Sequence, residues 1–274
     1  MLLAINRIQG MAGTRRVEVR SFGSEVPGPS VEELARWVRE RKGAAGDLTS
    51  YLLERSLEPQ GGVDRPCTGG LICRGRVLET ISGITGDTLT AEPSVQPALV
   101  EEDARWGTMQ KRALWFAVPC PHLLGIHDRY FHDRDEFCEG ICGVYRQIFR
   151  AMRDAGAGGH VLIGEKVYEG ELEHLAGPKT FFFYPGLARE NLPSLLEQQT
   201  SAAVPGGLLP AAFDLLDEYD LRSLSVLDGK EVDLLAALEH LDPGRLSLGG
   251  YCREGEKDCR KYWEDLVERA VIPR

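Results

Sequence analysis

Short apolar or β-branched runs alternate along the chain with segments of helical periodicity. This alternation is typical of βα units that build a parallel sheet. The last five runs begin at positions 160, 180, 201, 222 and 245, a spacing that suits compact βα units. The eight runs that we expect to be strands are Val17–Phe22, Gly70–Arg74, Ala113–Pro119, His160–Gly164, Thr180–Tyr184, Ser201–Val204, Arg222–Leu227 and Arg245–Gly249.

Several helices between these runs carry their own boundary signals. Asp133 and Glu136 form a capping pair, an apolar face with helical spacing follows to Met152, and Gly156 supplies a stop. The pattern predicts further helices from Ser30, over Glu231–Leu241 and over about Glu256–Ala270.

Eight strands with intervening helices predict an α/β protein, a (β/α)8 TIM barrel. The stretch between Val77 and Gln110 is too long for a simple connection. Alternating residues over Thr80–Thr90, with Gly83 and Gly86 as turn points, indicate a β-hairpin excursion between strands 2 and 3. A helix near Val100–Lys111 should follow the hairpin.

We expect residues 1–16 to form an N-terminal extension and residues 17–274 a single barrel domain. An open doubly wound sheet is the alternative architecture. Its dinucleotide-binding version loses support because no G-x-G-x-x-G motif follows a strand.

Composition narrows the class of protein. The 274 residues include 32 Lys and Arg against 42 Asp and Glu, a formal net charge of −10, which argues against a nucleic-acid partner. No apolar run approaches the ~18 residues of a membrane helix, so no membrane association is expected. Seven irregularly spaced cysteines are typical of a reduced, cytoplasmic protein.

In a barrel of this kind, the functional site lies at the carboxyl ends of the strands. We therefore expect Gly23, His122, Glu165, Asp228 and Cys252 to surround one hollow. Glu165 and Asp228 are candidates for acid–base catalysis, the alternative being that they cap loops. Anion contacts to a substrate are candidate roles for Arg20, Arg74, Arg76 and Arg253, the alternative being that they are solvated loop residues.

The segment after the third strand is rich in metal-ligating residue types. Cys120 and His122 are two residues apart, and His127, Asp128, His132 and Asp133 follow closely. If Cys120 and His122 point to the same side, Cys252 could complete a set of sulfur and nitrogen ligands. The alternative is that the later histidines are exposed loop residues and that Cys120 fills a small space in the core.

Several segments resemble cobalamin-independent methionine synthases and uroporphyrinogen-decarboxylase-like barrels. Phe116–Pro121 resembles the strand end that reads VPGP in that superfamily, and Val161–Glu165 resembles its IQIDEP strand. Arg20–Ser24 resembles the xxGSFP strand end that binds the amino-acid substrate in methionine synthases. Leu224–Leu241 and Arg245–Cys252 resemble the last two βα units of that family.

The resemblance implies an enzyme that transfers a methyl or other one-carbon group to or from a small acidic substrate. It further implies that Ser21, Gly23 and Ser24 contact this substrate. By their places at strand ends, Tyr184 is a further candidate for a substrate contact and His122 a candidate for catalysis. Zinc is the implied metal, and a folate, pterin or corrinoid is the implied methyl donor. A corrinoid protein or a second copy of the chain is the implied partner.

The chain departs from the methyltransferase pattern at the zinc ligands. The place of the His-x-Cys pair reads Phe182-Phe183-Tyr184, and only Cys252 stands at a matching ligand position. The DEP strand end of that family reads Gly164-Glu165-Lys166 here, which removes the first acid, the one that contacts the substrate amine. Two other hypotheses therefore stay open: a metal-free decarboxylase-like lyase, and a barrel that has lost catalysis and serves as a binding subunit.

Overall fold

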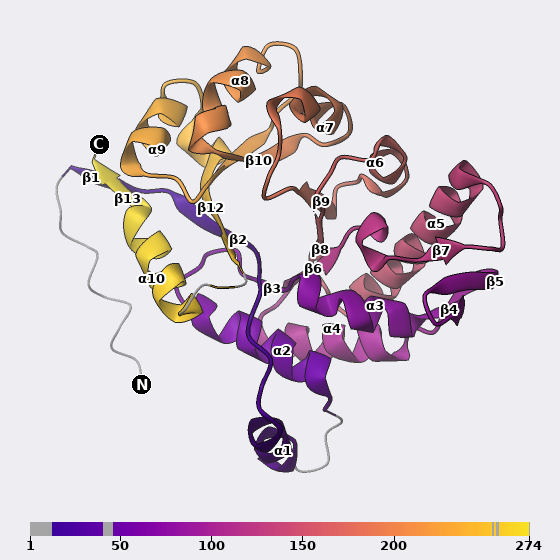
Figure 1. Cartoon of the computed structure of the whole chain (residues 1–274). Helices are drawn as coiled ribbons and strands as arrows, with labels where there is room; N and C mark the ends of the chain where they lie inside the picture. Colours follow the sequence, from indigo (N-terminus) through magenta and orange to yellow (C-terminus); the bar gives the residue numbers. More distant parts are fainter. Residues whose placement is uncertain (1–12, 41–45, 254, 256–257, 274) are drawn as a thin grey trace.

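A computed structural model describes residues 13–40, 46–253, 255 and 258–273. Its parallel strands lie inside a set of helices that covers their outer side (Figure 1). Eight strands form two parallel four-stranded sheets: β2 Glu18–Ser24, β3 Cys67–Gly69, β6 Trp115–Pro119, β8 Gly159–Ile163, β9 Thr180–Phe183, β10 Ser201–Pro205, β11 Ser223–Leu227 and β12 Leu246–Cys252.

One sheet has the order β10-β11-β12-β2 and the other β3-β6-β8-β9. At one junction a parallel bridge pairs Arg20 of β2 with Arg65, just before β3, and the Ser21 N–H donates to the Arg65 carbonyl at 2.9 Å. At the other, between β9 and β10, the Gln199 side chain replaces backbone pairing. Its Oε1 accepts from the Phe182 N–H at 2.6 Å, and its Nε2 donates to the Phe182 carbonyl at 3.2 Å. In the described residues, the strand pairing does not itself run continuously through all eight strands.

A buried apolar cluster draws one or two side chains from every one of these eight strands. It is separate from the larger core between strands and helices, because alternate residues of a strand point to opposite faces. Its members are Phe22, Cys67, Ala117, Val161, Ile163, Phe181, Phe183, Ala203, Leu227 and Tyr251.

Most of the helices pack apolar faces onto the strands, whereas the helix Val31–Glu40 packs its buried Trp37 against Tyr51 of the next helix. Asp133 caps the longest of them by accepting hydrogen bonds from the N–H groups of Asp135 and Glu136, as the sequence predicts. The α-helices are α1 Val31–Glu40, α2 Leu48–Leu57, α3 Arg74–Thr80, α4 Ala98–Gln110, α5 Arg134–Asp154, α6 Glu169–Leu175, α7 Leu192–Gln198, α8 Leu209–Asp214, α9 Glu231–Leu238 and α10 Cys259–Arg269.

The predicted hairpin excursion is confirmed. β4 Ile81–Thr85 and β5 Thr88–Val95 pair antiparallel, with Gly86 at a φ of +65° in the turn, and α4 follows. The short β7 His127–Asp128 adds to β5 (Figure 1). Farther away, β1 Thr14–Arg16 pairs with β13 Val271–Pro273, so the chain is already structured within the expected extension.

Seven of the eight predicted strands are confirmed with shifted ends, and the second is wrong. Residues Leu71–Cys73 form the 3₁₀ helix η2 and α3 follows at Arg74, whereas the strand lies at Cys67–Gly69. Glu25 is the physical reason, since its carboxylate accepts hydrogen bonds from the N–H groups of Leu71 and Ile72 and caps the helical segment. Within the described residues, none of the helices is long and apolar enough to cross a membrane.

Gly23 is required by the close approach of β2 to its neighbours. It has a φ of +116°, and a Cβ there would lie 2.7 Å from the Gly69 carbonyl oxygen and 2.9 Å from the Ala117 Cβ. We expect Gly23→Ala to lower the free energy of unfolding by about 2–3 kcal/mol in denaturant titrations. Gly28→Ala, with open space around it, should change it by under about 0.5 kcal/mol. Equal changes in the free energy of unfolding for Gly23→Ala and Gly28→Ala would contradict the close approach of β2 to Gly69 and Ala117.

Candidate metal centre

Cys120 and His122 lie where the chain leaves β6. Cys120 directly follows the strand, and His122 stands in the 3₁₀ helix η3 Pro121–Leu124. The Cys120 N–H donates to the carbonyl of Ile163 at 2.8 Å, which extends the pairing of β6 with β8 by one residue. The two side chains therefore leave a fixed backbone, and both point toward α6.

Glu171 of α6 meets both side chains. One carboxylate oxygen accepts the His122 backbone N–H at 2.7 Å, and the other lies 2.8 Å from the His122 Nδ1. Sulfur, imidazole nitrogen and carboxylate oxygen of Cys120, His122 and Glu171 lie within 4.8 Å of one another. The Glu171 side chain is only 5% exposed, so its charge is held almost out of water.

The surroundings of Cys120 keep it protonated when no cation is present. Its side chain is fully buried, and burial together with the nearby Glu171 charge raises the pKa of the thiol well above its usual value. A nucleophilic cysteine needs the opposite shift, toward the thiolate. A bound divalent cation would instead favour the thiolate directly, because metal coordination deprotonates a thiol. The centre thus suits metal binding better than covalent catalysis by a free cysteine.

A cavity of about 620 Å³ opens on the His122 and Glu171 side of this group. Tyr168 lies against the imidazole, with ring centres 4.5 Å apart. Phe137 and Cys138 of α5 line the cavity, and Arg134 is the one arginine or lysine among its lining residues in the described part of the chain. Its volume falls within the range of small-molecule sites.

Two buried polar atoms near the centre lack partners in the described structure. They are the Nε2 of His122 and the hydroxyl of Tyr184. The Tyr184 ring lies beside Cys120, because a Cβ on Gly164 would be 2.5 Å from that ring and 3.1 Å from the Cys120 sulfur. Buried polar atoms without partners are uncommon, and a bound group can satisfy them.

Glu165 and Asp228, which we expect to face one hollow at the strand ends, do not lie with Cys120 and His122. Glu165 is exposed to solvent. Asp228, at a φ of +51°, accepts a hydrogen bond from the Tyr262 hydroxyl at 2.5 Å, and its carbonyl accepts from Arg269. Neither carboxylate belongs to the group around Cys120.

Cys252 is bonded to Cys259 in a disulfide, so its sulfur is not a free ligand in this structure. The expectation of wholly reduced cysteines is therefore wrong for this pair, while the other five cysteines are free. Nearby, the Ser24 hydroxyl accepts the Trp263 indole N–H at 3.2 Å, and Arg253 is exposed and donates to the Pro185 carbonyl at 3.3 Å.

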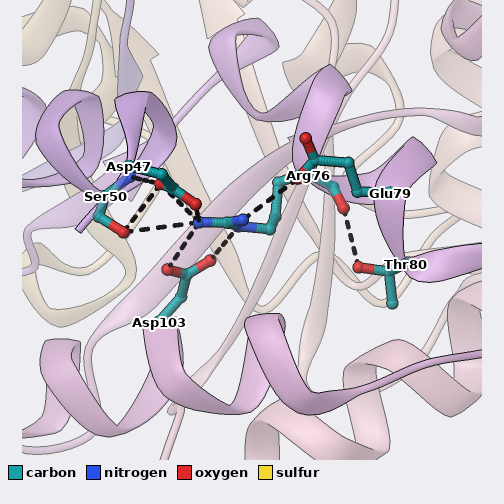
Figure 2. Close-up of polar contacts among 6 residues, drawn as sticks. All are labelled: Asp47, Ser50, Arg76, Glu79, Thr80 and Asp103. Carbon is teal, nitrogen blue, oxygen red and sulfur yellow. Dashed lines mark hydrogen bonds and ion pairs between the residues drawn. The ribbon is translucent and has the colours of Figure 1, made fainter. Parts of the chain in front are cut away.

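The two arginines predicted at the second strand end belong to α3, because that segment is helical. Arg74 donates to the carbonyls of Leu123 and Leu124. Arg76 is buried and binds Asp103 at 2.7 Å, Asp47 at 2.8 Å and Glu79 at 3.2 Å (Figure 2). Its guanidinium thus ties α3 to α4 and to the start of α2.

The remaining predicted substrate contacts are buried in the strand layer. The Ser21 hydroxyl accepts the Gly23 N–H at 3.1 Å, and Gly23 packs against Gly69. Tyr184 is 2% exposed, and burial raises the pKa of its hydroxyl. Of the predicted residues, the structure brings Cys120, His122 and Tyr184 together.

Sequence reasoning missed Glu171 and Tyr168. Glu171 directly precedes the buried Leu172 on a seven-residue helix, so helical periodicity gives it no distinctive position. The one local signal is an acidic residue on the inward face of a helix, which is uncommon because burying a carboxylate costs free energy.

The residues present fit a divalent metal ion of the zinc class. Thiolate, imidazole and carboxylate are its usual protein ligands, and three of them leave one position open in a catalytic site. A thiolate and a carboxylate would together balance a charge of +2. A bound cation would also offset the burial of Glu171, which no described arginine or lysine pairs with.

By its fold and its site, the chain is an α/β protein with parallel strands and a candidate metal centre at the end of one of them. Comparison with models of known families and with curated proteins finds no match. Solved structures do match. A B12-independent methionine synthase from Shewanella sp. W3-18-1, in complex with selenomethionine, superposes with a TM-score of 0.58 at 14% identity, over 93% of this chain and 97% of that one.

A putative vitamin-B12-independent methionine synthase from Listeria monocytogenes matches with a TM-score of 0.50 at 13% identity, over 92% of this chain and 96% of that one. At such identities the likeness establishes a methionine-synthase-like fold. This agrees with the resemblance that the sequence segments carry.

Proposed function

We propose that this chain is a metal-dependent enzyme that transfers a methyl or other one-carbon group to a thiol of a small acidic substrate. The proposed reactive centre is a zinc ion held by Cys120, His122 and Glu171. The observation that carries the proposal is the convergence of these three donors within 4.8 Å of one another beside a cavity of about 620 Å³.

The proposed architecture is a closed (β/α)8 barrel. Two observations support closure: eight parallel strands share one internal apolar cluster, and both junctions between the two sheets are bridged. Cys120 and His122 then lie at the carboxyl end of the barrel strand β6, the end where such barrels carry their sites, and Glu171 reaches them from α6, which follows β8. Their position differs from the family's ligand pattern, whose places are taken by Phe182, Tyr184 and the disulfide-bonded Cys252.

A zinc ion bound there would lower the pKa of a substrate thiol and so make it a better nucleophile. The protein residues supply the rest. Glu171 holds the η3 backbone at His122 in place, and the Tyr168 ring, tilted by 39° against the imidazole, restricts its position by packing. Arg134, which lines the cavity, could pair with the substrate carboxylate, and Cys120 is itself fully buried away from bulk water.

The test is metal content and transfer activity of the full chain. After removal of metal and addition of zinc, about one equivalent should remain bound through gel filtration. Methyl transfer from a methylated folate or corrinoid to an acidic thiol should then disappear on chelation and return with zinc. A protein that binds no zinc, or one whose lyase activity is insensitive to chelators, would contradict the proposal and favour the decarboxylase-like reading.

A further inference from the structure

A second cavity, of about 420 Å³, lies at the opposite end of the strands. It is bordered by the first residues of several strands: Trp115 of β6, Thr180 of β9, Ser201 of β10 and Ser223 of β11. Cys120, by contrast, follows the last residue of β6. The two cavities are therefore at opposite ends of the sheets and share no lining residue.

Arg20 of β2 borders this cavity and is 9% exposed. Its guanidinium carbon lies 4.3 Å from the centre of the Phe181 ring, 5.1 Å from that of Phe22 and 5.3 Å from that of Trp115. Aromatic faces stabilise a guanidinium, but they leave its N–H donors, which lie in its own plane, unused. Within the part of the chain that the structure describes, no carboxylate is hydrogen-bonded to Arg20.

The residues around Arg20 add further positive charge to this cavity. Arg65 and Arg222 also border the cavity, whereas its described lining contains no aspartate or glutamate. Glu18 and Asp220 are already paired with Arg65 at 2.7 Å and with Arg222 at 2.9 Å. Burial, followed by the repulsion of Arg65, lowers the pKa of Arg20 to about 10, and the weaker attraction of Glu18 does not offset these two effects.

We propose that this cavity binds a small oxyanion, a phosphate- or carboxylate-bearing molecule, with Arg20 as its principal partner. A guanidinium pairs with such groups through two parallel hydrogen bonds. The hydroxyls of Thr180, Thr200 and Ser201 border the same space and can donate to further oxygens. In a chain of formal net charge −10, anions are repelled overall. The described lining of this cavity is a local exception, because it contains three arginines and no aspartate or glutamate, although Arg65 and Arg222 each pair with an acid outside the lining.

Calorimetric titration of the full chain with pyrophosphate, inorganic phosphate and citrate, at fixed ionic strength, tests the proposal. We expect saturable binding of at least one probe, and the order of affinity between the phosphates and citrate distinguishes the two kinds of oxyanion. Arg20→Met should raise the dissociation constant at least about tenfold. Arg150→Gln, which removes the same charge from an exposed position on α5, should leave it unchanged.

Arg222→Gln is the second variant, because its exposed side chain can be changed without disturbing the core. Arg222→Gln should also weaken binding of the anion, and it tests the proposal if Arg20→Met does not fold. Absence of saturable binding by all three probes would overturn the proposal. So would a dissociation constant that neither Arg20→Met nor Arg222→Gln changes, and Arg20 would then be a structural plug of the strand layer.

Discussion

Replacing His122 by alanine is expected to weaken zinc binding by more than the roughly 10- to 100-fold that loss of an outer-sphere partner causes. His122 supplies one of only three donors, and its imidazole also meets the carboxylate of Glu171 at 2.8 Å. The change thus removes a ligand and leaves Glu171 buried with one hydrogen bond fewer. Competition with a chromophoric chelator measures the affinity, and circular dichroism checks the fold.

Two control variants test whether other candidate ligands of the chain, His127 and Cys252, bind the zinc instead. His127→Ala removes an exposed histidine of the same ligand-rich segment, and zinc affinity should not change. Cys252→Ser removes the cysteine that matches a family ligand position, and it should not change zinc affinity either, because that sulfur is bonded to Cys259. If Cys252→Ser weakened zinc binding and His122→Ala did not, the proposed ligand set would be wrong.

Replacing Arg76 by leucine is expected to lower the free energy of unfolding by about 3–5 kcal/mol, the usual cost of removing one partner of a buried ion pair. The Arg76 side chain is 5% exposed and that of Asp103 is 7% exposed. Without the guanidinium, the Asp103 carboxylate would stay buried without its counter-charge. Asp47 and Glu79 lose a partner too, but they are half exposed and water screens them.

The free energy of unfolding that Arg76→Leu loses should depend on pH. Burial raises the pKa of Asp103 to about 6, and the attraction of Arg76 opposes that rise. In Arg76→Leu the pKa of Asp103 in the folded state should rise further, because the attraction of Arg76 is gone. A carboxyl whose pKa is higher in the folded than in the unfolded state contributes stability that is fully present below its unfolded pKa. That contribution is lost as the pH rises through its folded-state pKa. The deficit relative to wild type should therefore be smaller at pH 5 than at pH 8, as measured by urea unfolding.

Arg105→Leu is the matched control for Arg76→Leu. Arg105 lies on α4 and forms an exposed i,i+4 pair with Glu101 at 2.7 Å. Such pairs contribute about 0.3–0.5 kcal/mol, so the cost should stay near that value. If Arg76→Leu costs no more than Arg105→Leu at pH 8, the buried network does not stabilise the fold as described.

Most of the fold is predictable from the sequence because strand and helix periodicities are local. The cap at Asp133 and the turn at Gly86 are set by residues within a few positions of each, and both are confirmed. The second strand is not predictable in this way. Its boundary depends on Glu25, which is 46 residues from Leu71 in sequence and caps that segment through a long-range hydrogen bond.

The candidate site is predictable only in part for the same reason. Cys120 and His122 stand out because they are neighbours in sequence. Glu171 joins them through the packing of α6 against α5 and the end of β6, at a separation of 49 residues from His122. Cys252 matches a family position, but the sequence does not reveal that Cys259, seven residues on, is its partner.

X-ray absorption at the zinc edge, on the zinc-loaded full chain and on its Cys120→Ser variant, tests whether zinc is bound by Cys120. We expect one sulfur neighbour at about 2.3 Å with nitrogen and oxygen neighbours at about 2.0–2.2 Å, and complete loss of the sulfur signal in the variant. A wild-type spectrum without sulfur, or a sulfur signal that persists in Cys120→Ser, would contradict it.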